Sequence, residues 1–93
     1  MWARVARFEG DPGTVDDRVA GLRTAIDSGE MPAELTDVKL LLLVDRESGG
    51  MLAVTLFDSK EALHKGDAAL NARTGTPGAR ASVQFYEVPI HTF

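Results

Sequence analysis

The chain has 93 residues, enough for one domain (1–93) with a modest core, because a chain this short buries only about 60 to 65% of the surface it exposes when unfolded. Its 14 acidic and 10 basic residues leave a net charge of −4 without a basic cluster, which argues against a nucleic-acid partner. The absence of cysteine excludes disulfides, thiolate metal sites and a cysteine nucleophile. No stretch approaches the roughly 18 apolar residues of a membrane span, and the start lacks the apolar core of a signal peptide, so we expect a cytoplasmic protein without a membrane partner.

A strand and a helix are expected first. Residues 2–8 mix β-branched and aromatic side chains with single arginines, and the turn formers of 9–13 follow, so the segment predicts a strand. Thr14 suits the N-cap of a helix that runs to about Ser28 and ends at Gly29. Four apolar residues of this helix recur at the spacing of one helical stripe: Val15, Val19, Leu22 and Ile26.

The middle of the chain predicts a β-hairpin. A loop over 30–36 separates the first helix from two apolar runs, 38–44 and 51–57. The segment between these runs, 45–50, ends in two glycines and is typical of a hairpin turn.

A second helix and a last strand complete the chain. Asp58 and Ser59 both suit an N-cap, and the following stretch to Asn71 is rich in Ala and Leu, so it predicts a helix. A loop is expected over 73–80 and a strand over 82–88. The order βαββαβ predicts an α+β, ferredoxin-like fold in which two helices cover one face of a four-stranded antiparallel sheet.

The predicted sheet is apolar on both faces. Alternation along 38–44 places Leu41 and Leu43 on one face and the other apolar residues of this strand on the opposite face. A face of four strands of about seven residues covers roughly 400 to 450 Å², from about 4.8 Å between strands and about 3.3 Å per residue. An apolar patch of that size favours a partner surface, and the simplest partner is a second copy in a twofold homodimer. The alternative is that the leucine run lies under a long loop.

The layout, together with Phe57-Asp58-Ser59-Lys60-Glu61-Ala62-Leu63 and Tyr86-Glu87-Val88, resembles the dimeric α/β-barrel superfamily, and within it the antibiotic biosynthesis monooxygenase-like proteins. The resemblance implies a dimeric α/β barrel with any pocket between the sheet and the helices of each subunit. Members include cofactor-free oxygenases of aromatic polyketides, haem-degrading enzymes and proteins without an assigned role. Where relatives commonly place His or Trp on the second helix, this chain has Gly66.

Two functions follow as hypotheses, neither of which needs a cofactor or a metal. One is an oxygenase-like enzyme for an aromatic substrate, with His64 for proton transfer, Arg7 for charge stabilisation and Tyr86 for positioning. The other is a non-catalytic dimeric module that binds a small apolar or aromatic molecule, or is structural only. Its expected pocket is lined by four residues: Phe57, Gly66, Leu70 and Phe85.

Several of these residues also have a purely structural interpretation. His64 could be a solvated surface residue, and Gly66 could let the second helix lie close to the sheet. Arg4 and Arg7 fall on opposite faces of the first strand, so at least one of them points toward an apolar region. For that side chain an ion pair, with Glu87 or Glu9, is the alternative to binding an anion.

Overall fold

The computed structural model describes residues 1–29, 33–35, 38–72 and 79–92. Six main elements follow one another in the order βαββαβ, as predicted, and two short 3₁₀ turns cover Pro12–Thr14 and Ala33–Leu35. The main elements are β1 (Trp2–Glu9), α1 (Val15–Asp27), β2 (Lys39–Val44), β3 (Met51–Phe57), α2 (Lys60–Asn71) and β4 (Ala79–Glu87). Most of each loop expected over 30–36 and 73–80 lies outside the described residues.

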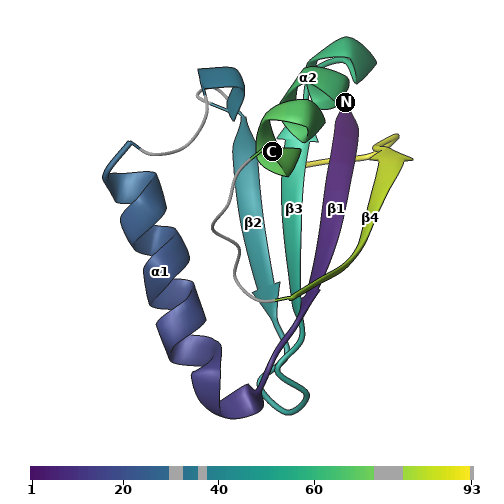
Figure 1. The fold of residues 1–93 in the computed structure, drawn as a ribbon. Coiled ribbons are helices and arrows are strands. Elements are labelled where there is room, and N and C mark those ends of the chain that lie inside the picture. The colour runs from purple at the N-terminus through teal and green to yellow at the C-terminus, as the bar shows by residue number, and fades with distance from the viewer. Residues whose placement is uncertain (30–32, 36–37, 73–78, 93) are drawn as a thin grey trace.

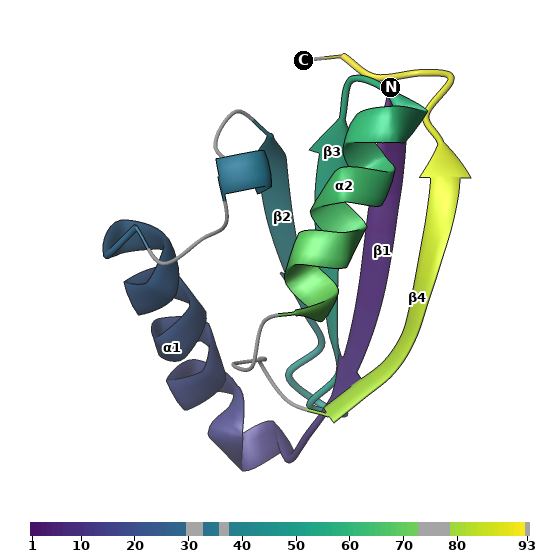
Figure 2. The ribbon, with the colours of Figure 1, turned by 45° about the horizontal axis from the view of Figure 1, so that its top comes forward.

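The four strands form one antiparallel sheet in the order β2-β3-β1-β4 (Figure 1). The central pair, β1 and β3, aligns Trp2 with Phe57 and Arg7 with Leu52. Helix α2 lies over β3 and β1, whereas α1 lies beside β2 at the edge of the sheet (Figures 1 and 2). The predicted α+β, ferredoxin-like class is confirmed.

The predicted cap residues lie at the ends of the helices, although one of them makes no side-chain cap bond. Gly29 has a φ of +76° after α1, a conformation that glycine adopts readily. Ser59 accepts a hydrogen bond from the backbone N–H of Ala62 at 3.1 Å and caps α2. Thr14 occupies the predicted N-cap position of α1, but its hydroxyl donates to the backbone oxygen of Asp11 at 2.8 Å and makes no cap bond to the helix. The last strand begins at Ala79, three residues before the predicted start.

The helix face of the sheet carries two apolar clusters. One joins the hairpin end of the sheet to the start of α1 and consists of Ala6, Phe8, Val15 and Met51. The other lies under α2 and consists of Leu35, Phe57 and Leu63. On α1, Val15 and Ala25 are buried, whereas Ile26 is 44% exposed.

The opposite face of the sheet has no helix on it in the described structure. The register places Leu41 beside Val54 and Leu43 beside Leu52 on this face, which we call the open face. Leu41 and Leu43 are each 49% exposed. None of the described helices has the length and apolar character needed to cross a membrane.

Candidate functional site

A groove of about 480 Å³ lies between α1 and the helix face of β2. We call it the α1–β2 groove. Apolar side chains form its two walls: Val19, Leu22 and Ile26 from α1, and Leu40, Leu42 and Val44 from β2. The volume falls within the range of about 300 to 1,000 Å³ that is common for small-molecule sites.

At its first turns, α1 is attached to the rest of the fold by a hydrogen bond and by apolar packing. There, Arg18 donates a hydrogen bond from Nη2 to the backbone oxygen of Gly49 in the hairpin at 2.7 Å. Val15 belongs to the apolar cluster with Phe8 and Met51, and Val19 packs against that cluster. Farther along α1, Ile26 remains 44% exposed although it belongs to the apolar stripe. The predicted stripe is thus real, but three of its four members line a groove.

Three charged side chains also line the groove. Arg23 and Asp27 come from α1, and Arg46 follows the end of β2. Nη1 of Arg46 lies 2.9 Å from Oδ1 of Asp16. The groove therefore combines apolar walls with a few charged groups, an arrangement that holds an apolar body and orients a polar end.

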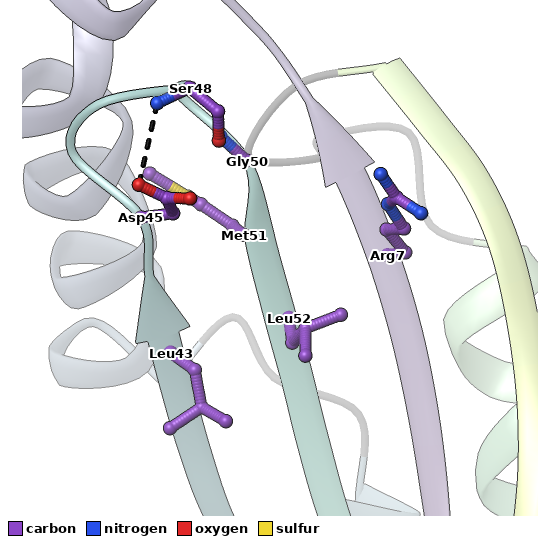
Figure 3. Close-up of a pocket in the computed structure, with 7 residues that line it drawn as sticks. All are labelled: Arg7, Leu43, Asp45, Ser48, Gly50, Met51 and Leu52. Carbon is purple, nitrogen blue, oxygen red and sulfur yellow. Dashed lines mark hydrogen bonds between the residues drawn. The ribbon is translucent and has the colours of Figure 1, made fainter.

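A second hollow, of about 310 Å³, lies on the open face near the hairpin (Figure 3). Its lining comes from β1, β2, β3 and the hairpin turn, and includes Arg7, Leu43 and Leu52. The carboxylate of Asp45 accepts hydrogen bonds from the backbone N–H groups of Glu47 and Ser48, at 3.0 and 3.4 Å. These bonds lower the pKa of Asp45 below its usual value, so its carboxylate stays ionised at neutral pH.

The three residues predicted for catalysis do not lie together. His64 is exposed on α2, and its ring lies edge-on to Phe85, with 5.6 Å between the ring centroids. Phe85 pairs with Arg4 and so lies on the helix face, whereas Arg7 pairs with Leu52 on the open face. Tyr86 also lies on the open face, where its hydroxyl bonds to Gln84. The sheet thus separates His64 from the other two.

The four residues predicted to line a pocket lie at the α2 side of the sheet. A β-carbon built on Gly66 would lie 2.5 Å from two ring carbons of Phe57, so the Phe57 ring fills the space beside this glycine. Leu70 packs against the cluster that contains Phe57, and Phe85 is 42% exposed. None of the four lines the α1–β2 groove.

A buried ion pair holds α2 on the sheet. The sequence predicted an ion pair but not its partner. Arg4 is 4% exposed, and its Nε lies 2.8 Å from Oδ1 of Asp67 on α2. Oδ1 of Asn71, one turn farther on, accepts hydrogen bonds from Arg4 and Arg80. The ion-pair interpretation of Arg4 is correct, but its partner is neither Glu9 nor Glu87. The spacing of Asp67 and Asn71, i and i+4 on one helix face, is the signal that could have located it.

Comparisons with known proteins show a likeness to a solved structure. No protein-family model matches the chain, and no curated protein matches it either. Among solved structures, it is similar to a protein of Chloroflexus aurantiacus J-10-fl that carries the provisional name antibiotic biosynthesis monooxygenase. The TM-score is 0.57, with 17% identity over 99% of this chain and 95% of that one. The likeness shows a shared fold, a four-stranded antiparallel sheet with two helices, of the kind expected from the sequence.

Proposed function

We propose that the protein is a non-catalytic module that binds a small apolar molecule in the α1–β2 groove and works as a homodimer. The observation that carries the binding part is the apolar groove of about 480 Å³ between a helix and the sheet. The dimer part is supported by the two half-exposed leucines of the open face.

The lining of the groove favours binding over catalysis. His64, Arg7 and Tyr86, the candidates for chemistry, are not part of it. Its polar members are two arginines and one aspartate, which can orient a ligand but do not form a nucleophile paired with a base. The alternative, a cofactor-free monooxygenase-like enzyme for an aromatic substrate, draws support from the shared fold alone.

The homodimer would form through the open face, since Leu41, Leu43 and Leu52 lie there and no described helix covers it. A second copy packed there would also cover the hollow that contains Arg7. The α1–β2 groove belongs to the other face of the sheet, so dimerisation would leave it accessible to a ligand.

Binding of a neutral apolar dye such as Nile red tests the proposed groove. We expect saturable binding to the full chain, measured by fluorescence titration. Ile26→Glu should weaken it by about fivefold or more, because a charge replaces part of an apolar wall. Ile90→Glu is the matched control, since Ile90 is 83% exposed and lies outside the groove. Equal loss in both variants, or no binding to the parent chain, would contradict the proposal.

A further inference from the structure

The charged groups of the α1–β2 groove differ in how well they are paired. Within the described part of the chain, Arg23 takes part in no hydrogen bond or ion pair, although Asp27 follows it by four residues. Arg46 is paired with Asp16, but the two side chains are 67% and 85% exposed, so the pair is weak and open to exchange. An anion that enters the groove can therefore gain contacts with arginine at little cost in existing ones.

The positive and negative groups are also separated along the length of the groove. Arg46 lies near the first turn of α1, as its ion pair with Asp16 shows, and Asp27 is the last residue of this helix. Arg23 lies between Asp16 and Asp27 along α1, about 10 Å from the first and about 6 Å from the second at about 1.5 Å per residue. The positive groups thus occupy the hairpin end and the middle, and the negative group occupies the far end.

We infer that the ligand is an apolar molecule with one carboxylate, which Arg23 and Arg46 hold toward the hairpin end of the groove. This inference rests on the proposed function and names the chemical class of its ligand. The apolar body packs against Leu22, Leu40 and Leu42, and the carboxylate points away from Asp27. A guanidinium suits this task because its planar donors match both oxygens of a carboxylate, while its methylene stem extends the apolar wall.

A matched pair of ligands separates recognition of the carboxylate from apolar binding. Decanoate and decan-1-ol have the same chain length and differ in charge, and each is titrated against Nile red bound to the full chain. We expect decanoate to displace the dye at about a tenfold lower concentration than the alcohol, the size of one charge-assisted hydrogen-bonded contact. Raising the salt concentration should weaken the binding of decanoate and leave that of the alcohol unchanged, because salt screens an exposed charge pair.

Two substitutions test the direction of the charges. Arg23→Met should weaken the binding of decanoate by about fivefold and leave that of decan-1-ol unchanged. Asp27→Asn should strengthen the binding of decanoate by about twofold, since a repulsive charge is removed. Lys65→Met is the control for a lost positive charge, because Lys65 is exposed on α2 and pairs with Glu61 outside the groove.

The outcomes distinguish this inference from the function on which it rests. Equal displacement by decanoate and decan-1-ol, or an equal loss of decanoate affinity in Arg23→Met and Lys65→Met, overturns the inference that the ligand carries a carboxylate. The proposal that the groove binds apolar molecules then still stands. A chain that binds neither ligand nor the dye overturns both. Unchanged circular dichroism and melting temperature of Arg23→Met show that a loss of affinity is a loss at the groove.

Discussion

Gly49 has a positive φ of +80° in the hairpin, and a β-carbon at this position would overlap the carbonyl oxygen of Gly10. We expect Gly49→Ala to lower the free energy of unfolding by about 2 to 4 kcal/mol, from the left-handed backbone and the overlap together. Gly50→Ala is the neighbouring control, because the nearest atom, 3.2 Å from its added β-carbon, belongs to the side chain of Ser48. Urea unfolding of both variants gives the comparison. Equal losses would show that the close approach of the hairpin to Gly10 contributes nothing.

At the scale of the element, the closeness of α2 to the sheet depends on a glycine in the middle of the helix. Alanine is usually favoured over glycine there by about 1 kcal/mol. We nevertheless expect Gly66→Ala to destabilise the protein by about 1 to 2 kcal/mol, because the new methyl group would lie 2.5 Å from ring carbons of the buried Phe57. Thermal and urea unfolding measure the change.

Gly21→Ala in α1 is the matched control for this helix effect. No atom lies within 4 Å of a β-carbon added to Gly21, so the same exchange should stabilise the protein by up to about 1 kcal/mol. A second check is the background Phe57→Leu, in which Gly66→Ala should cost less because the ring is gone. A stabilising effect of Gly66→Ala in the parent chain would show that the ring can move aside.

Most of the elements could be predicted from local patterns, whereas the site could not. The hairpin of β2 and β3 follows from two apolar runs around a glycine pair, and Ser59 and Gly29 mark helix ends by their own chemistry. The α1–β2 groove depends instead on how far a helix stands from a strand, a distance that no short pattern encodes. The stripe of α1 predicted a packed face, but toward its end Ile26 lines the groove and remains half-exposed.

The same limit applied to the predicted catalytic set. Strand alternation showed that neighbouring residues face opposite sides, but the choice of face required the register of the whole sheet. Arg4 faces α2 and Arg7 the open face because β1 lies between β3 and β4 with Phe57 under the helix. His64 could therefore be placed on a helix from sequence, but its separation from Arg7 could not.

At the scale of the whole molecule, the open face carries apolar side chains that no described helix covers. Leu41, Leu43 and Tyr86 are about half exposed there, and their neighbours in the register include Leu52 and Val54. Apolar side chains on a sheet stabilise the protein only when another surface covers them. The stabilisation is about 25 cal/mol for each Å² removed from water. A second copy offers the same apolar side chains, so a twofold dimer would cover the open face of each copy with that of the other.

We therefore expect the purified protein to be a dimer at micromolar concentration, measured by analytical ultracentrifugation. Leu43→Glu should shift it to monomers, because two-fold symmetry would place two carboxylates in one apolar interface. Ile26→Glu is the matched control: Ile26 is similarly exposed, 44% against 49%, but lies on α1 at the groove. A parent chain that sediments as a monomer at this concentration, or an Ile26→Glu variant that dissociates as readily as Leu43→Glu, would mean that the open face is not the interface. The reciprocal loss of dye binding in Ile26→Glu alone would show that the two faces of the sheet serve separate tasks, assembly on one and binding on the other.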